Sequence, residues 1–124
     1  LLESRDTEVA ETDHENVERM KEAASYLIGT HDFTSFCGNK KMKKTAVRTI
    51  YEINFTKKGN DLWIDYRGNG FLQNMVRILT GTLIEVGDGR RAPEELPQIL
   101  ESKNRENAGY TAPACGLMLM EVHY

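Results

Sequence analysis

The sequence has no long hydrophobic run and few residues that cross-link a small protein. No apolar stretch approaches the ~20 residues that span a bilayer, and no signal-peptide pattern opens the chain, so we expect a cytoplasmic protein. Its two cysteines, Cys37 and Cys115, lie in neither a CxxC nor a Cys/His spacing. This argues against a zinc site and favours reduced thiols that pack in the structure. We expect no metal.

Recognisable catalytic and nucleotide-binding patterns are also missing. There is no Walker or GxGxxG pattern, and Gly87-Asp88-Gly89 does not continue into the acidic ladder of a calcium loop. His31 beside Asp32 could be a general-base pair, but side chains of adjacent residues diverge on most backbones and no nucleophile stands in a recognisable setting. We therefore expect structural roles for both residues.

The charges are unevenly distributed along the 124 residues, a length that fits one domain. Residues 1–18 hold seven acidic groups and one arginine, whereas residues 19–124 hold 15 basic and 12 acidic groups. Residues 40–48 hold five basic residues and no acidic one: Lys40, Lys41, Lys43, Lys44 and Arg48. They could meet a phosphate backbone, although a charge run is more often only a solvated loop.

The first residues show no sustained hydrophobic period. We interpret 1–15 as an acidic linker or disordered arm and 16–124 as the folded domain. Because the chain begins at Leu1 without an initiator methionine, we also expect it to be a fragment.

The first predicted helix starts at Asn16 as its cap and closes at Gly29. Its apolar positions recur at helical spacing: Val17, Met20, Ala24 and Leu27. The residues 30–36, THDFTSF, should form a loop that Phe33 and Phe36 anchor to the core.

Two strands are predicted over 47–56 and 61–67, joined by the turn residues KKGN into an antiparallel hairpin. In the first strand, alternation places five residues on one face: Val47, Thr49, Tyr51, Ile53 and Phe55. Ile50 interrupts this pattern slightly.

Two further helices and a strand complete the expected order. One helix runs from about Leu72 to Val86 and ends at Gly87, and another begins near Pro93, a good first-turn residue. The final segment, CGLMLMEVHY, is apolar on both faces at its start, which favours an inner strand. The order predicts an α+β fold, with an antiparallel or mixed sheet and helices packed on one face.

Arg77 is the one arginine in the apolar stretch 68–87 and lies in its middle. The core stripe of this helix is made by Leu72, Met75, Val76, Leu79, Leu83 and Val86. Arg77 lies off that stripe, on the flank of Ile84. The pattern alone leaves two alternatives. Arg77 either lies in solvent or in a structural salt bridge, or it points into a cleft that holds an anion.

Paired glycines precede this helix. Gly68 and Gly70 bracket Asn69, and such a pair lets backbones approach closely or adopt positive φ. We interpret this pair as a tight connection in preference to a phosphate loop.

Four motifs together, HDFTSF, RTI, GNGFLQNMVRILTGTLIEVGDG and AGYTAPACGLMLMEVHY, carry a resemblance. In order and spacing they resemble the C-terminal domain of the tRNA pseudouridine synthase A family, over nearly all of 17–124. The resemblance implies a homodimeric enzyme that converts uridines at positions 38 to 40 of the tRNA anticodon stem-loop to pseudouridine without a cofactor. The family's catalytic aspartate belongs to the N-terminal domain, in a Gly-Arg-Thr-Asp motif that this sequence does not contain. The resemblance therefore predicts that this chain alone is inactive.

The resemblance also assigns roles to residues. It implies that Arg77 forms an ion pair with that aspartate and that Leu117 packs near the flipped base, although an ordinary core leucine is the alternative. Phe71 would set the helix entry beside the pocket, and the basic residues 40, 41, 43, 44 and 48 would contact tRNA phosphates. Gln73 departs from the aromatic residue or histidine common in the family.

Two alternatives remain open at this stage. A non-catalytic RNA-binding module would use exposed aromatic residues on adjacent strands, for which Tyr51 and Tyr66 are candidates, although both also suit a core face. A subunit that mediates protein association would use the doubly apolar final strand.

Overall fold

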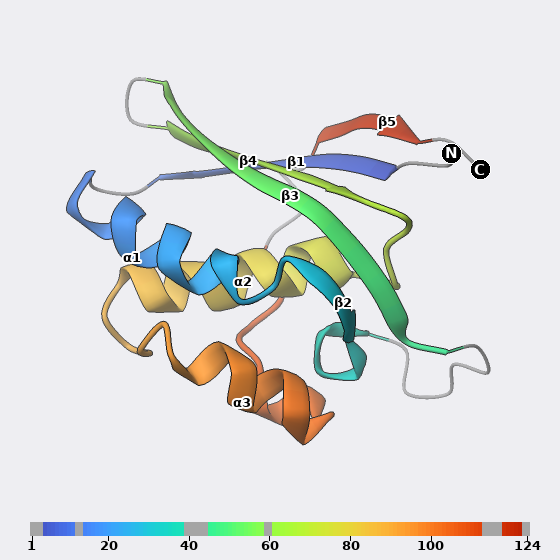
Figure 1. The fold of residues 1–124 in the computed structure, drawn as a ribbon. Coiled ribbons are helices and arrows are strands. Elements are labelled where there is room, and N and C mark those ends of the chain that lie inside the picture. The colour runs from blue at the N-terminus through green and yellow to red at the C-terminus, as the bar shows by residue number, and fades with distance from the viewer. Residues whose placement is uncertain (1–3, 12–13, 39–44, 59–60, 113–117, 123–124) are drawn as a thin grey trace.

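One sheet covered by helices on a single face makes up the computed structural model, which describes residues 4–11, 14–38, 45–58, 61–112 and 118–122. The strands pair in the order β2-β3-β4-β1-β5, and every pair is antiparallel. Helices α1 and α2 lie against the sheet and α3 lies farther from it (Figure 1). The predicted α+β class is confirmed.

The element bounds are as follows. The strands are β1 Ser4–Glu11, β2 Gly29–Asp32, β3 Val47–Lys58, β4 Asp61–Gly68 and β5 Met118–Val122. The helices are α1 His14–Ser25, α2 Met75–Gly87 and α3 Glu95–Ser102, with short 3-10 turns η1 at Thr34–Phe36 and η2 at Arg105–Asn107. None of the described helices is long and apolar enough to cross a membrane.

The beginning of the chain differs from the acidic linker or disordered arm expected over 1–15. Residues 4–11 form β1, which pairs with β4 from Ser4 opposite Gly68 to Glu11 opposite Asp61. Main-chain groups supply this pairing, so it does not require the apolar alternation that the sequence lacks. The assignment of 16–124 as a domain stays a prediction.

The final strand also differs from its prediction. β5 pairs with β1 and ends the described sheet, so it is an edge strand rather than the inner strand expected from its apolar faces. The inner position beside β4 is taken by β1, and β5 pairs on the outer side of β1.

Helix α1 is present with shifted ends. It begins at His14, so Asn16 lies in its first turn and is not the cap, and it ends at Ser25, before Gly29. Gly29 has a φ of +102° and opens β2. Residues 30–32, expected in a loop, complete that strand, whereas Phe33 and Phe36 are fully buried as predicted.

Strand β3 changes the face that it buries at Tyr51. Ile50 pairs with Gly68 and Glu52 pairs with Arg67, which leaves Tyr51 as an extra residue in the ladder, a β-bulge. Side chains alternate across a strand, so one extra residue exchanges the inward and outward positions on its two sides.

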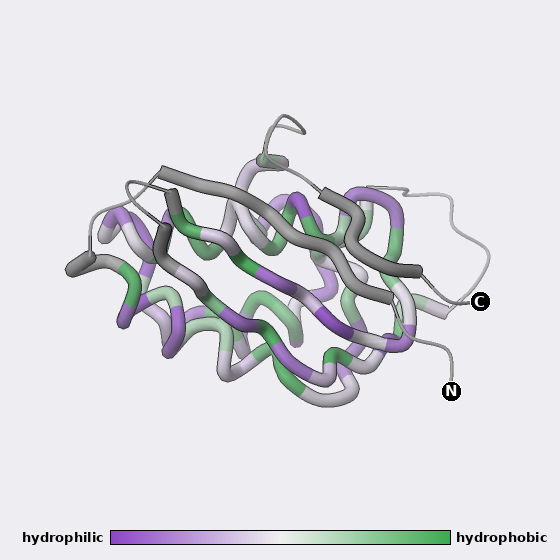
Figure 2. The backbone as a smooth tube through the Cα atoms, turned by 90° about the horizontal axis from the view of Figure 1, so that it is seen from above, coloured by the Kyte–Doolittle hydropathy of each residue, from purple (hydrophilic) through white to green (hydrophobic). Residues whose placement is uncertain are grey.

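The exposures show the exchange. Ile50 is 1% exposed, whereas Val47 and Tyr51 are 42% and 36% exposed. Beyond the bulge, Ile53 and Phe55 pack against the core. The predicted face is therefore wrong at its first positions and right at its last two. In the adjoining β4, which carries both hydrophobic and hydrophilic residues (Figure 2), the alternate residues Leu62, Ile64 and Tyr66 are buried.

Helix α2 is the central element of the core. It starts at Met75, later than the predicted Leu72, because Asn74 has a left-handed backbone with a φ of 59°. Every residue of the predicted core stripe is buried, and Ile78, Thr80 and Thr82 are fully buried as well. The Tyr66 hydroxyl is hydrogen-bonded to Thr80 Oγ1 at 2.6 Å, which joins β4 to the helix. Hence α2 is enclosed on nearly all sides.

Helix α3 follows the prediction more closely. It begins at Glu95, two residues after Pro93, and its apolar side is buried at Leu96, Ile99 and Leu100.

Truncation of Ile50 should be far more destabilising than truncation of Val47. We expect Ile50→Ala to lower the free energy of unfolding by about 2–4 kcal/mol, because it leaves a cavity in the core. Val47→Ala removes an exposed side chain and should cost less than about 1 kcal/mol. Urea denaturation of both variants measures this, and equal losses would contradict the bulge at Tyr51.

Candidate functional site

The loop between β4 and α2 is held tightly on β3. The Asn69 amide donates to the carbonyl of Thr49 at 3.0 Å, and Asn69 Oδ1 accepts from the Thr49 amide at 2.9 Å. A Cβ on Gly68 would lie 2.6 Å from the same Thr49 carbonyl oxygen, so only glycine allows this approach. Gly70 has a φ of +155°, which also favours glycine. The tight connection predicted from the paired glycines is confirmed.

Arg48 lies over this loop. Its Nε is 3.7 Å from the position that a Cβ on Gly70 would occupy. Its Nη1 donates to the carbonyls of Thr45 and Val47, each at 2.8 Å. These bonds hold the half-buried side chain close to its own strand and leave its charge without an acidic partner among the described residues.

Phe71 and the residues after it lead the chain into α2. Phe71 is half-buried, and its ring lies 3.4 Å from the Cβ position of Gly68. The Gln73 carbonyl accepts from the Gly38 amide at 2.9 Å, which attaches the loop to the segment after η1. Phe71 thus lies before the helix, and the role predicted for it stays a prediction.

Arg77 is half-buried in the first turn of α2. Its Nε donates to the carbonyl of Ala112 at 2.7 Å, and its Nη1 makes a longer hydrogen bond of 3.4 Å to Asn74 Oδ1. Both acceptors are neutral, and no acidic side chain among the described residues pairs with it. The guanidinium is thus held in place while its charge stays uncompensated within this part of the chain, and it can attract an anion.

Three of the predicted site residues, Arg48, Phe71 and Arg77, therefore border one loop, which leads from β4 into the first turn of α2. The others lie outside the described residues: Lys40, Lys41, Lys43, Lys44 and Leu117.

Sequence reasoning missed the neutral partners of Arg77, which are Asn74 and Ala112. Asn74 is three residues from Arg77 and was detectable as a helical neighbour. Ala112 is 35 residues away, and only the packing of its segment on α2 brings it to Arg77. Gly81, a glycine inside a helix, was the available signal for such a close approach.

His31 and Asp32 make separate local contacts. His31 Nε2 is 2.9 Å from the carbonyl oxygen of Ile28, and Asp32 Oδ1 accepts from the Thr34 hydroxyl at 2.5 Å and the Thr34 amide at 2.9 Å. The Thr34 hydroxyl is the largest influence and lowers the pKa of Asp32; burial opposes it, while the Thr34 amide and Lys103 add to the lowering. The contacts agree with the structural roles predicted for both residues.

The aromatic candidates for base stacking have different environments. Tyr66 is buried and hydrogen-bonded to Thr80, so its ring is not available to RNA. Tyr51 is exposed and lies under the Arg67 guanidinium at 5.7 Å. A pair of exposed rings on adjacent strands, as the RNA-binding alternative expected of these two residues, is not present.

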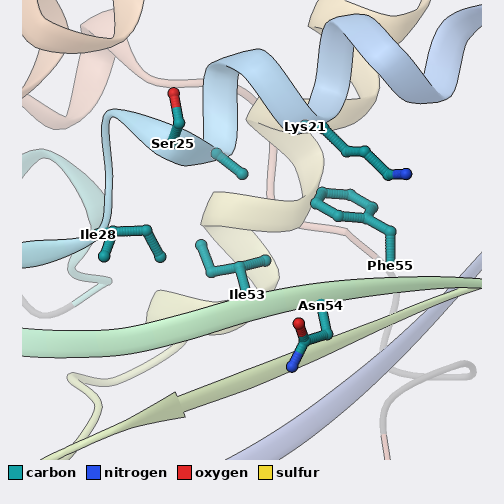
Figure 3. Close-up of a pocket in the computed structure, with 7 residues that line it drawn as sticks. Lys21, Ser25, Ile28, Ile53, Asn54 and Phe55 are labelled. Carbon is teal, nitrogen blue, oxygen red and sulfur yellow. The ribbon is translucent and has the colours of Figure 1, made fainter.

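A pocket of about 420 Å³ lies between α1 and β3 (Figure 3). Its lining consists of Lys21, Ala24, Ser25, Ile28, Ile53, Asn54 and Phe55, and none of these was a predicted site residue. The described residues contain no cluster of three metal-ligating side chains. Cys37 is a buried thiol, which agrees with the packing role expected of it, while Cys115 lies outside the described residues.

Comparison with known proteins relates most of the chain to one family. A family model described as tRNA pseudouridine synthase matches residues 23–124. The proteins named tRNA pseudouridine synthase A from Brevibacillus brevis and Bacillus subtilis are 54% and 52% identical over 109 residues. The protein of that name from Anoxybacillus flavithermus is 55% identical over 109 residues. Each match covers 88% of this chain but only 44–45% of the relative, so the chain spans less than half the length of these proteins.

Asp32 should make the stability of the chain depend on pH. Its pKa is lowered from 3.8 in the folded state, so its stabilising contribution is fully present above the unfolded pKa and is lost as the pH falls through the folded pKa. The difference in unfolding free energy between the wild type and Asp32→Asn should thus be constant above about pH 5 and narrow below about pH 4. Urea denaturation across this range measures it. In Thr34→Val, which lacks the hydroxyl donor, the narrowing should be smaller, and an unchanged profile would contradict the assigned cause.

Proposed function

This chain belongs to the tRNA pseudouridine synthase family, and from that membership we propose that it is the C-terminal domain of an enzyme that isomerises uridines in the tRNA anticodon stem-loop, at positions 38 to 40. The reaction breaks the bond between uracil N1 and the ribose and forms one from uracil C5, with a proton lost at C5 and gained at N1. It is redox-neutral, so we propose that it needs no cofactor. The names of the relatives support tRNA as the substrate.

The observation that carries the proposal is the state of Arg77. A half-buried guanidinium with only neutral acceptors among the described residues is suited to an anion from elsewhere. We propose that this anion is the catalytic aspartate of the N-terminal domain. Two unit charges about 4 Å apart attract by roughly 4 kcal/mol at an effective dielectric constant of 20. This attraction lowers the pKa of the aspartate and keeps it ionised where water is scarce.

The substrate would meet the same end of α2. Arg48, which lies on Gly70 in the loop before the helix, would bind tRNA phosphates together with Lys40, Lys41, Lys43 and Lys44. We propose that Phe71 and Leu117 pack near the flipped uracil, where apolar surfaces hold the base. Phosphate contacts of this kind position the RNA and weaken as salt is added.

We propose in addition that the full-length protein is a cytoplasmic homodimer, as the family resemblance implies. The chain then has two partners besides tRNA: the N-terminal domain of its own polypeptide and a second subunit.

In the full-length enzyme, Arg77→Ala should reduce turnover far more than tRNA affinity. The change leaves the aspartate without its positive partner, and loss of a preorganised charge lowers kcat by about 100-fold or more. Single-turnover assays of tritium release from tRNA labelled at uracil C5 measure the rate, and filter binding measures affinity. We expect the dissociation constant to change less than about threefold.

Arg77→Lys serves as the control for charge alone. Lysine keeps the charge, but its single nitrogen cannot bind the Ala112 carbonyl and also present two further nitrogens to a carboxylate. The turnover of Arg77→Lys should therefore lie between those of the wild type and Arg77→Ala. A loss confined to tRNA affinity in both variants would contradict the assigned role of Arg77.

The chain of 124 residues by itself should release no tritium above background, because it contains no Gly-Arg-Thr-Asp motif. The same assay with the full-length enzyme is the positive control. Turnover by the chain alone would show that the catalytic carboxylate lies within it and would refute the proposed division of the site.

A further inference from the structure

Residues 108–112 lie directly along α2 and run antiparallel to it. The Gly109 amide donates to Thr82 Oγ1 at 2.8 Å, and the Ala112 amide donates to the Arg77 carbonyl at 3.0 Å. Between these bonds, the backbone of Tyr110 passes over Gly81 so closely that a Cβ there would lie 1.8 Å from the Tyr110 carbonyl oxygen. The segment is thus held at two points, with a close approach between them.

Thr82 is well suited to hold one end. It is fully buried, and its hydroxyl donates its hydrogen to the Ile78 carbonyl at 2.9 Å. The oxygen is then oriented to accept from the Gly109 amide, so a single side chain joins the helix backbone to the segment. On the other side, Arg105 donates to the Gly109 carbonyl at 2.8 Å and to Thr111 Oγ1 at 3.2 Å.

The other end of the segment is bonded to Arg77 in both directions. The Ala112 amide donates to the Arg77 carbonyl, and the Ala112 carbonyl accepts from Arg77 Nε at 2.7 Å. Ala112 is itself buried. Because Nε is engaged there, the guanidinium has a set orientation, and Nη2 together with the second hydrogen of Nη1, whose other hydrogen makes the long bond to Asn74, can meet a carboxylate.

We propose that Thr82 and Gly81 are positioning residues for Arg77: they hold the 108–112 segment so that the Ala112 carbonyl fixes the guanidinium, and Nη1 and Nη2 engage the catalytic aspartate. This inference rests on the function proposed above and adds the residues that orient the charge. A preorganised donor stabilises an ion pair without reorganising during the reaction, whereas small displacements of catalytic groups cost large factors in rate.

The central test compares two matched threonines of α2 in the full-length enzyme. Thr82→Val removes the acceptor of Gly109 while keeping the side-chain shape, and kcat should fall about tenfold with KM for tRNA nearly unchanged. Thr80→Val removes an equally buried hydroxyl, the one bonded to Tyr66, and should lose stability without the fall in kcat. Thr82→Ser, which retains the hydroxyl, should restore most of kcat.

The pH dependence of kcat gives a readout that a merely structural role would not change. The guanidinium lowers the pKa of the aspartate, so a displaced guanidinium lets that pKa rise. Activity that requires the ionised aspartate should then fall away at a higher pH in Thr82→Val than in the wild type and Thr80→Val. Arg105→Ala, which loosens the same segment from outside the helix, should shift the profile in the same direction if Thr82→Val fails to fold.

The double variant Arg77→Ala/Thr82→Val separates this inference from the proposed function. If Thr82 acts through Arg77, adding Thr82→Val to Arg77→Ala should change kcat less than about twofold. If the losses in kcat of the two single variants multiply in the double variant, or if Thr82→Val and Thr80→Val have equal kcat values, the positioning role is overturned while that of Arg77 stays intact. An Arg77→Ala enzyme with wild-type turnover would instead overturn the proposed function.

Discussion

The close approach between Gly81 of α2 and the backbone of Tyr110 is the constraint on which the arrangement of the site depends. No side chain fits between them, so residues 108–112 lie against the helix and bring Ala112 to Arg77. The same helix is also joined to β4, through the Tyr66–Thr80 hydrogen bond. Packing in the core therefore holds α2, and residues 108–112 orient the guanidinium of the arginine in its first turn.

The environment of Arg77 explains how an apolar helix tolerates a charge. Two neutral acceptors satisfy some of its donors, so burial of the charge costs less than it would without partners. An acidic neighbour in the same domain would have neutralised it permanently. With none among the described residues, the positive charge is available to a carboxylate from elsewhere, as the proposed pairing with an aspartate of another domain requires.

Local patterns predicted much of this fold. Helical periodicity identified the buried stripe of α2, because a stripe depends only on residue spacing along one helix. The paired glycines Gly68 and Gly70 predicted a tight connection, since glycine alone permits the backbone geometry found there. The faces of β3 could not be assigned in the same way. Ile50, which interrupts the alternation, is a sign of the change in the sequence of β3, but the bulge at Tyr51 is defined only by the ladder with β4.

By itself, the sequence determined the fold class, the buried face of α2 and the presence of one arginine in an apolar helix. These features depend on residue types and on their spacing over a few turns of chain. Only the tertiary structure decided that 4–11 form a strand between β4 and β5 and that Ala112 binds Arg77. Both are contacts between residues distant in sequence. Main-chain hydrogen bonds hold 4–11 in the sheet, and the main-chain carbonyl of Ala112 accepts the bond from Arg77. Main-chain groups of this kind are common to nearly all residues, so no side-chain pattern indicates which partner they bind.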